Sequence, residues 1–339
     1  MDSRIVQLDP NEGYDSSGLD MGFIYYSAEY SSFLSMLLDA KNRHLISGPA
    51  HNPFAMFPLL EKAGPHGMVL NSLPFFGSHG GPVTRGESPI VASVMLQHLD
   101  QMISSKQWDA VTVIEHPLQP WVTEDLANLT NLKIADTRVS QITEWKRDPP
   151  DSLEELLVQF HGKMRNAIRK GMATGQVVSQ ANSEAEWQFL EYQHANAIRR
   201  LGGVEKNHSV FDCLRHHLGK RVRLHCGYVD SSLSSALLTL RYGSTTEYFV
   251  PVVSPEMREQ QVLPHLIAQV MLTDFQNGIS RWNWGGTWES QSGVLRFKSR
   301  FGATNRKYRY LNWCTPRIRE TSQDRILRSY PYWYLRKFE

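Results

Sequence analysis

A run of basic residues between positions 163 and 170 is the first feature of the sequence that could do chemistry. Lys163, Arg165, Arg169 and Lys170 occur there with no acidic residue between them. On a helix, residues four positions apart are neighbours, so Arg165 and Arg169 share a face and the four side chains form a wide basic stripe. Arginine offers phosphate two parallel hydrogen bonds, and lysine offers a mobile point charge. The stripe predicts a phosphate-binding surface, and a solvated helix face is the alternative.

A second basic cluster surrounds Lys298. The segment 296–309 carries six Lys or Arg residues and no Asp or Glu. If residues 292–301 are helical, Arg296 and Arg300 share one face and Lys298 projects apart from both. We predict that the two arginines bind substrate. A lysine ammonium can stabilise an oxyanion or protonate a leaving group, so Lys298 is the candidate catalytic residue. A phosphate contact without chemistry is the alternative role.

The string Trp282-Asn283-Trp284-Gly285-Gly286 ends a predicted strand. Its glycines allow the backbone amides to approach a carbonyl or a phosphate closely. We therefore predict that Asn283, Trp284, Gly285 and Gly286 bind substrate. A strand-to-helix turn packed by tryptophan is the alternative.

The charge of the chain is unevenly distributed between its halves. Residues 1–150 carry ten Lys or Arg against seventeen Asp or Glu, and residues 151–339 carry twenty-six against seventeen. The halves thus have formal charges of −7 and +9. A basic half indicates a polyanionic ligand such as a nucleotide, a lipid pyrophosphate or RNA, with a solvated basic surface as the alternative.

The remaining composition is typical of a cytoplasmic enzyme. The three cysteines show no CxxC spacing, which favours reduced thiols, and no apolar run is long enough to span a membrane. Histidines and cysteines near positions 213–226 lack a recognised ligand spacing, so we expect no metal site. The sequence also lacks a nucleophile elbow, a P-loop and a dinucleotide fingerprint, which argues against hydrolases, kinases and Rossmann enzymes.

Strands and helices are predicted to alternate in both halves, which indicates an α/β fold. Buried strands are expected at 69–76 and 110–115, and an antiparallel set at 221–253. Arg147-Asp148-Pro149-Pro150-Asp151 is the best linker, because two prolines remove backbone donors and disfavour helix before them. We therefore predict domains at 1–150 and 151–339. After the linker, one helix is expected to run from Ser152 to Gly171 or Gly175.

Three strings resemble the Fem family of peptidoglycan-bridge aminoacyltransferases and related N-acetyltransferase-like (GNAT-like) proteins of polysaccharide gene clusters. Residues 161–171 resemble the helix K-x-R-N-x-I-R-K-A/G of that family. Gly285-Gly286 followed by residues 296–303 resembles its GG…FK-x-x-FG signature, and Ser72-Leu73-Pro74-Phe75-Phe76 before Gly80-Gly81-Pro82 resembles its S-L-P-F…GG-P stretch. The resemblance covers roughly residues 20–315.

The resemblance implies two tandem GNAT-like α/β domains with mixed, mostly antiparallel sheets flanked by helices. The second domain would hold the acyl-transfer site, and the first would help to form the acceptor cleft. Fem enzymes move an amino acid from aminoacyl-tRNA to an amine of a cell-wall precursor, whereas relatives can use acyl-CoA. Where many N-acetyltransferases have a catalytic tyrosine, this sequence has Phe297 beside Lys298, as in the Fem family.

We therefore expect an acyl- or aminoacyltransferase that acts on an amine of a nucleotide- or lipid-linked sugar or peptide, in cell-wall or polysaccharide biosynthesis. No cofactor would be tightly bound, and the donor would be aminoacyl-tRNA or acyl-CoA. Strand 246–253 would supply backbone edges for the donor, although 255–264 lacks the glycines usual in CoA-binding loops. One alternative is an acyl-CoA-dependent enzyme acting on an amino sugar or small amine, and another is a non-catalytic binder of an anionic precursor or RNA.

The C-terminal segment 330–338 mixes aromatic and basic residues. Such side chains suit either docking on the protein or contact with a membrane surface that carries a lipid-linked acceptor. We expect docking, with peripheral membrane contact as the alternative.

Overall fold

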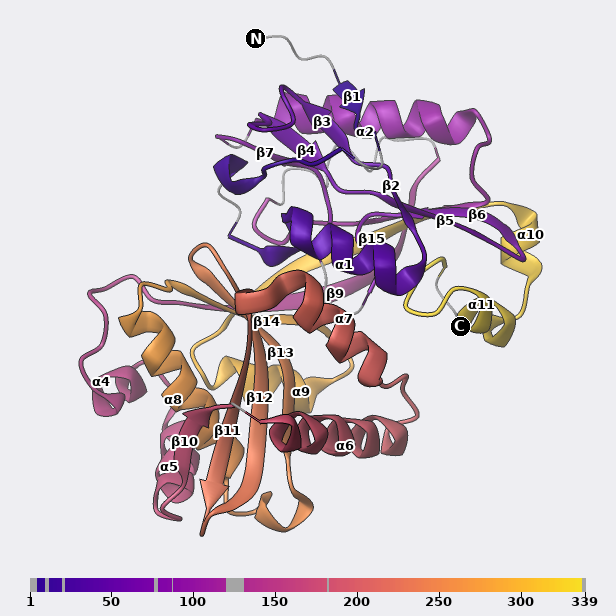
Figure 1. Ribbon diagram of the computed structural model, residues 1–339. Helices are drawn as coiled ribbons and strands as arrows, with labels where there is room; N and C mark the ends of the chain where they lie inside the picture. The colour runs from indigo at the N-terminus through magenta and orange to yellow at the C-terminus, as the bar shows by residue number, and fades with distance from the viewer. Residues whose placement is uncertain are drawn as a thin grey trace. The chain divides into compact units, whose positions relative to one another are not determined.

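The computed structural model describes residues 5–9, 12–19, 22–75, 79–86, 88–119, 131–181 and 183–336. It divides the chain into two compact units, which are coloured by residue number in Figure 1. Unit 1 comprises Met1–Ser140 and Arg306–Glu339, and unit 2 comprises Gln141–Asn305. These bounds differ from the predicted domains 1–150 and 151–339, because strand β15 (Thr304–Cys314) carries the chain out of unit 2 and back into unit 1.

Unit 1 is built from short strands and two longer helices. Its helical elements are η1 (Ser17–Leu19), η2 (Ile24–Tyr26), α1 (Ala28–Leu38), α2 (Pro89–Ser104), α10 (Pro316–Glu320) and α11 (Gln323–Ser329). Its strands are β1 (Ile5–Gln7), β2 (Lys41–Asn42), β3 (Leu45–Ser47), β4 (Ala55–Phe57), β5 (Leu60–Gly64), β6 (Gly67–Asn71), β7 (Val83–Thr84) and β8 (Ala110–Ile114). Strand β9 (Lys133–Glu144), like β15, passes from one unit to the other.

The core of unit 1 lies between α2 and the strands. The side chains of Val91, Met95 and Leu99 recur at helical spacing, and they pack with Phe57 of β4 and Val111 of β8. Strands β1, β3, β4 and β7 form an antiparallel sheet in that order, and β15, β8, β6, β5 and β2 are neighbours in the other sheet. Among these neighbours, β6 and β8 run parallel.

The predicted strand 69–76 ends at Asn71, five residues early, and Phe76 lies outside the described residues. The chain turns there because Leu73 and Phe75 adopt positive φ angles of 52° and 100° around a proline. The turn is tied to β8, since the Ile114 N–H donates to Ser72 Oγ at 2.7 Å and the Gly80 N–H donates to the Ile114 carbonyl at 3.1 Å.

The C-terminal segment docks on unit 1. Tyr330, Trp333 and Leu335 are buried, and the Phe75 N–H donates to the Tyr332 carbonyl at 2.9 Å. These aromatic side chains are therefore covered by protein, as expected for a docked tail, and are not presented to a membrane. No helix in the described part of the chain has the length and apolar character needed to cross a bilayer.

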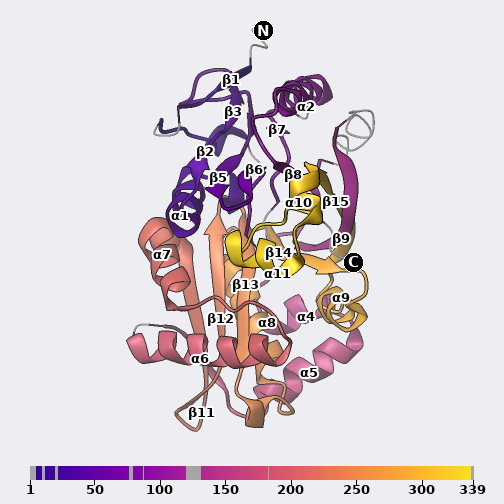
Figure 2. The ribbon, with the colours of Figure 1, turned by 90° about the vertical axis from the view of Figure 1, so that its right-hand side faces the viewer.

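Unit 2 has longer strands flanked by helices on both faces (Figures 1 and 2). Its strands are β10 (Val177–Gln180), β11 (Val222–Val229), β12 (Ser232–Tyr242), β13 (Thr245–Val253) and β14 (Arg281–Trp288), adjacent in that order. Its helices are α4 (Leu153–Val158), α5 (Gly162–Met172), α6 (Glu184–Arg200), α7 (His208–Leu218), η3 (Gly219–Arg221), η4 (Pro255–Met257), α8 (Val262–Gln276) and α9 (Ser292–Ser299).

The sheet of unit 2 is antiparallel except where β13 and β14 run side by side in the same direction. Helix α8 covers one face, and its Leu266 and Met271 pack with Ile168 of α5, Leu237 of β12 and Trp282 of β14. Helix α6 packs against β12 and β13 from the other side. The observed sheets are mixed and mostly antiparallel, as predicted.

One predicted helix is wrong in its extent. The helix expected from Ser152 onward is two helices, α4 and α5, separated at residues 159–161. His161 has an extended conformation, with φ −61° and ψ 144°, and its ring accepts a hydrogen bond from the Lys163 N–H at 3.2 Å. The histidine thus starts a new helix, because its side chain satisfies an amide that lacks an intrahelical partner.

Candidate functional site

Strands β13 and β14 of unit 2 separate shortly after they begin. They pair at only three positions, Thr245 with Arg281, Thr246 with Trp282 and Glu247 with Asn283. Both strands then continue, to Val253 and Trp288, without pairing to each other. Each strand therefore has facing backbone donors and acceptors that an extended ligand can use. We call the region around the last pair the splay.

A β-bulge lies next to the splay. Leu238 of β12 pairs with Val250, whereas the next residue, Thr239, pairs with Tyr248, so Phe249 is an extra residue on β13. A bulge bends its strand and redirects the side chains around it, which is why bulges are frequent beside active sites.

Two polar side chains are buried side by side at the splay. Thr246 contacts Asp274 of α8, and Tyr248 packs against Trp284 at a ring distance of 4.8 Å, so these residues face α8. Because side chains alternate along a strand, Glu247 faces the other side of the sheet, as does its neighbour Asn283. Glu247 is 2% exposed and Asn283 is 0% exposed.

The side-chain amide of Asn283 is only half satisfied. Its Oδ1 accepts a hydrogen bond from the Gly285 N–H at 3.0 Å, and its buried Nδ2 has no hydrogen-bond partner among the described residues. Leaving a buried donor unpaired typically costs about 1–3 kcal/mol. A donor of this kind at the splay is suited to a substrate carbonyl.

Lys206 lies on the same side of the sheet. Its ammonium is 5.3 Å from the centre of the Phe249 ring, and its backbone N–H donates to His194 Nε2 of α6 at 3.1 Å. Burial lowers the pKa of Lys206 to about 8. No sequence signal singled out Lys206 or Glu247, because neither belongs to a recognised motif and both are brought to the splay by folding.

Lys298 of α9 is 6% exposed and lies against β14. Its ammonium donates to the Trp284 carbonyl and to Thr287 Oγ1, both at 2.7 Å. Burial lowers the pKa of Lys298 to about 8, so the side chain is mostly protonated at neutral pH. The predicted catalytic residue thus lies beside Gly285 and Gly286, where β14 continues to Trp288 instead of ending as predicted, and two of its three N–H groups bind the protein.

The other predicted site residues near Gly285 and Gly286 differ from one another in their surroundings. The Trp284 ring is part of the core, and its indole N–H donates to Thr143 Oγ1 at 2.9 Å, so Trp284 presents only its backbone at the splay. Gly285 has a φ of 69°, a left-handed conformation that favours glycine over other residues. Its backbone N–H donates to Asn283 Oδ1. Arg296 of α9 is exposed, and Arg300, which caps the end of α9, is partly exposed.

The basic stripe lies on the α8 side of the sheet, away from Glu247 and Lys206. Helix α5 packs closely against the start of α8, since a Cβ at Gly171 would lie 2.4 Å from the Gln261 carbonyl oxygen. Lys163 and Lys170 are exposed. Arg169 forms an ion pair with Glu154 at 2.6 Å, and Arg165 donates to the Phe160 carbonyl at 3.0 Å. Both predicted arginines thus already have partners within the protein.

Phosphate binding by α5 remains a prediction that calorimetry can test. We expect Arg165→Ala or Arg169→Ala to weaken binding of pyrophosphate by about 1–3 kcal/mol, the usual value of a charge-assisted hydrogen bond. Glu154→Gln should strengthen binding, because it releases Arg169 from its ion pair. Lys146→Ala, which changes an exposed lysine outside the stripe, is the control. Unchanged affinity in both arginine variants would remove α5 from the site.

Comparison with known proteins places unit 2 among acetyltransferase folds. Residues 159–299 match the family model described as Acetyltransferase (GNAT) domain. The structure is similar to that of FemX, with 13% identity, a TM-score of 0.69 and coverage of 90% of this chain and 96% of that chain. Sequence comparison with curated proteins yields no match.

Two further solved structures share the fold. The C-terminal domain (DUF2156) of a putative lysylphosphatidylglycerol synthetase from Agrobacterium fabrum has 11% identity and a TM-score of 0.57, and the alignment covers 90% of this chain and 94% of that chain. A conserved protein of unknown function from Bacteroides thetaiotaomicron has 10% identity and a TM-score of 0.56, with coverage of 89% and 93%. These likenesses confirm the predicted GNAT-like α/β fold and its similarity to Fem proteins, and residues 159–299 are similar to acetyltransferase domains, as expected for an acyltransferase.

Within the described residues, no three His, Cys, Asp or Glu side chains gather as metal ligands. The candidate site consists of Glu247, Asn283, Lys206 and the contact of Lys298 with β14 at Trp284.

Proposed function

We propose that unit 2 transfers an activated acyl or aminoacyl group to an amine of a nucleotide- or lipid-linked precursor of the cell envelope. The observation that carries the proposal is the splay, where buried Glu247 and Asn283 occupy the last paired position of β13 and β14. An extended donor can pair with the separated strand edges and bring its carbonyl to these side chains. The fold shared with FemX supports the reaction class.

Each step of the reaction has a candidate group at the splay. The acceptor ammonium must lose a proton before it attacks, and the Glu247 carboxylate can take it. The amine nitrogen then forms a bond to the donor carbonyl, whose oxygen becomes negative. The Asn283 amide and the remaining N–H of Lys298 can stabilise that oxygen. When the ester or thioester bond breaks, Lys298 can give a proton to the leaving oxygen or sulfur, and the second proton of the newly bonded nitrogen then passes to the neutral Lys298 amine, which leaves an amide and the ammonium.

Lys206 can bind an anionic part of the acceptor. Its ammonium lies over the Phe249 ring, and the lowered pKa of about 8 reflects the loss of solvent around it. An ammonium in such a place gains more from a phosphate than an exposed lysine does, because fewer waters screen the charges. Nucleotide- and lipid-linked precursors both carry phosphate.

A cytoplasmic location fits this proposal, since aminoacyl-tRNA and acyl-CoA are made there.

The donor is the part of the proposal that an assay resolves most directly. We expect amide formation when the protein is incubated with labelled aminoacyl-tRNA and an amine acceptor that carries a pyrophosphate. Product formation with acetyl-CoA and an amino sugar instead would favour the acyl-CoA-dependent alternative. Lys298→Met, assayed in parallel, separates enzymatic transfer from spontaneous aminolysis of the donor.

The non-catalytic alternative has a different outcome in the same experiment. A protein that only binds an anionic precursor or RNA would retain both ligands and form no product, and Lys298→Met would behave like the wild type. That result with both donors would exclude the proposed transfer.

A further inference from the structure

The connection between α6 and α7, residues 201–207, is held at both ends by polar contacts. On the α6 side, Arg199 forms an ion pair with Glu205 at 3.1 Å, and the His194 ring accepts the Lys206 N–H. On the α7 side, the first residue of the helix, His208, reaches back to α6. The position of Lys206 over Phe249 therefore depends on these contacts.

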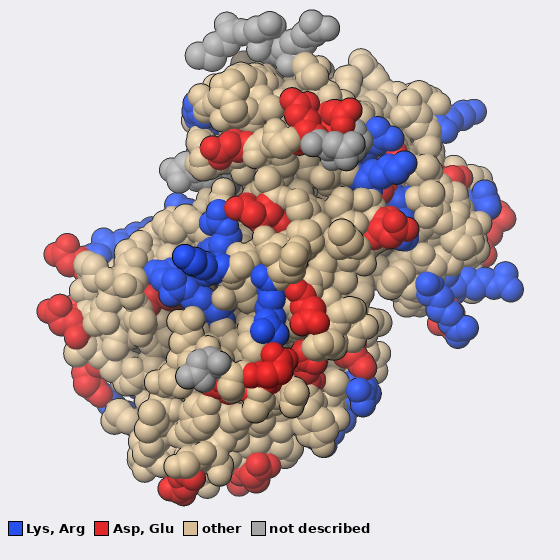
Figure 3. Space-filling model, viewed as in Figure 1, with Lys and Arg blue, Asp and Glu red and all other residues tan. Residues whose placement is uncertain are grey.

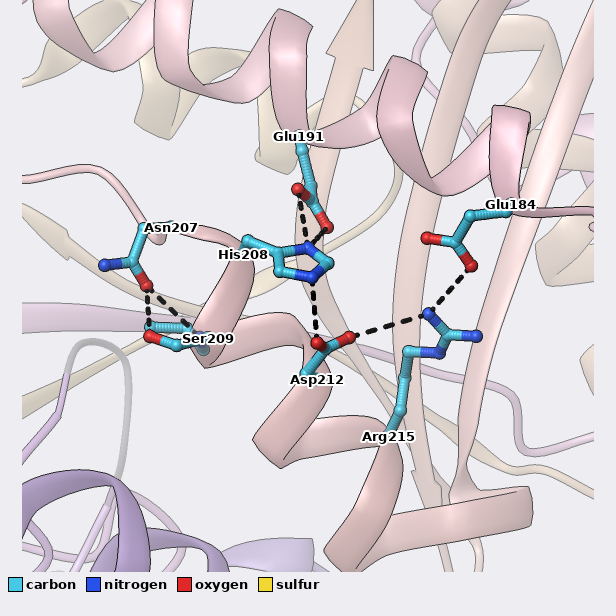
Figure 4. Close-up of polar contacts among 8 residues, drawn as sticks. Glu184, Glu191, Asn207, His208, Ser209, Asp212 and Arg215 are labelled. Atoms are coloured by element: carbon cyan, nitrogen blue, oxygen red, sulfur yellow. Dashed lines mark hydrogen bonds and ion pairs between the residues drawn. The ribbon is translucent and has the colours of Figure 1, made fainter.

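His208 is bound by a carboxylate on each edge of its ring (Figure 4). Its Nδ1 lies 3.0 Å from Glu191 Oε1 of α6, and its Nε2 lies 2.9 Å from Asp212 Oδ2 of α7. A neutral imidazole has one N–H donor and one lone pair, whereas an ionised carboxylate only accepts. Both contacts can be hydrogen bonds only when His208 is the imidazolium.

The contacts extend along both helices. Arg215 Nη1 lies 3.7 Å from Asp212 Oδ1 and 3.3 Å from Glu184 Oε2. Acidic and basic side chains therefore alternate along one chain of contacts, which runs through Glu184, Arg215, Asp212, His208 and Glu191. Figure 3 shows the same interleaving of basic and acidic side chains over α6 and α7. The two carboxylates lie on opposite edges of the imidazole ring, so one cation could not bind all three groups.

We propose that His208 is a positioning residue, a proton-controlled latch that joins α6 to α7 and thereby holds Lys206 over Phe249. The role of Lys206 in acceptor binding rests on the function proposed above, whereas the latch itself does not. The latch is closed when His208 is protonated. When it deprotonates, one ring nitrogen turns a lone pair toward a carboxylate, that hydrogen bond is lost, and the connection becomes freer to open.

The pH range of the latch follows from the groups that face His208. The hydrogen bond from Glu191 raises the pKa of His208 above its usual 6.5, and the charges of Glu191, Asp212 and Glu184 add to the effect. Arg215 is the nearby cation on α7. A group whose pKa is raised on folding stabilises the contact fully below about pH 6.5 and loses that effect as pH rises through the folded value.

Two other groups near the connection, His194 and Lys206, have pKa values that distinguish them from His208 or can be tested by their own variants. Burial lowers the pKa of His194 to about 4, so its ring stays neutral throughout. Lys206, with a pKa of about 8, loses its own proton at higher pH. A test of the latch therefore needs variants at both His208 and Lys206.

Hydrogen exchange of peptides that contain residues 201–207 measures the latch without any substrate. After correction for intrinsic exchange, we expect protection in the wild type to fall about two- to fivefold between about pH 6 and pH 9, as for the loss of an exposed ion pair. His208→Gln can make only one of the two hydrogen bonds and cannot titrate, so its protection should be low and independent of pH. Lys206→Met should keep the wild-type profile.

The matched control is His216→Gln, which removes an exposed histidine from the same helix, α7, outside the latch. Its exchange profile should match the wild type. Protection in the wild type that does not change with pH, or a pH-dependent loss that persists in His208→Gln, would overturn the latch. Thermal melting of each variant, followed by circular dichroism, checks that unit 2 stays folded.

Acceptor kinetics test the positioning of Lys206. Lys206 and Lys298 both titrate near pH 8, so the test compares wild type with His208→Gln at each pH. We expect the wild-type KM for a phosphate-bearing acceptor to show an additional rise with the same midpoint as the exchange profile, and His208→Gln should lack that additional step while its kcat equals that of the wild type at each pH. A flat KM beside a pH-dependent exchange profile would overturn the positioning of Lys206. If no transfer occurs at all, the exchange result still decides the latch, so the two failures are distinguishable.

Discussion

Lys298→Met should lower kcat about a hundredfold with little change in KM, the effect expected for loss of one preorganised electrostatic contact. Acyl transfer builds negative charge first on the carbonyl oxygen and then on the leaving group, so the ammonium helps the transition state more than the bound substrate. Methionine keeps much of the apolar stem of Lys298 and removes the charge. Steady-state kinetics with saturating donor measure both parameters, and a change confined to kcat identifies an interaction made mainly in the transition state.

The stability of the same variant provides the control. The folded pKa of about 8 is below the ordinary 10.5, so the unfolded chain binds more protons between these values and stability rises with pH across that window. At neutral pH the buried ammonium therefore lowers the free energy of unfolding. Lys298→Met removes this cost together with the two hydrogen bonds of the ammonium, so the variant should melt near the wild-type temperature. Normal kcat with a raised KM would instead make Lys298 a substrate-holding residue and contradict its catalytic assignment.

Glu247→Gln should lower kcat/KM by about 10²–10⁴, the usual contribution of general acid–base catalysis. Glutamine preserves the shape of Glu247 and cannot take a proton from the acceptor ammonium. The defect should shrink as pH rises toward the pKa of the acceptor amine, because the free amine then forms without a base. A pH profile of kcat/KM for both proteins measures this recovery.

Glu256→Gln is the matched control, since Glu256 is exposed on η4 just beyond β13. It should leave the profile unchanged. A Glu247→Gln enzyme with wild-type kcat/KM at neutral pH would mean that the acceptor reaches the site as a neutral amine. A uniform loss at every pH would indicate that Glu247 orders β13 and takes no proton.

Much of the architecture was predictable because its signals are local. The apolar run predicts a buried strand at residues 110–115, and β8 ends one residue earlier, at Ile114. Cap chemistry predicts a helix start at Ser152, and there the Ser152 side chain accepts a hydrogen bond from the Glu155 N–H at the start of α4. In the structure the Lys298 ammonium binds the Trp284 carbonyl of β14, next to the glycine pair at 285–286.

By itself, the sequence determined the α/β fold class, the order of most strands and helices, and the two basic clusters, because each depends on residues close together in the chain. Only the tertiary structure decided the rest. Packing between segments that are far apart in the chain decides the return of β15 to unit 1, the burial of Lys298, the pairing of Glu247 with Asn283 and the contact of Lys206 with Phe249. A lone lysine at 206 or a lone histidine at 208 has no pattern of its own. Their neighbours, Phe249 and Glu191, are brought to them by folding alone.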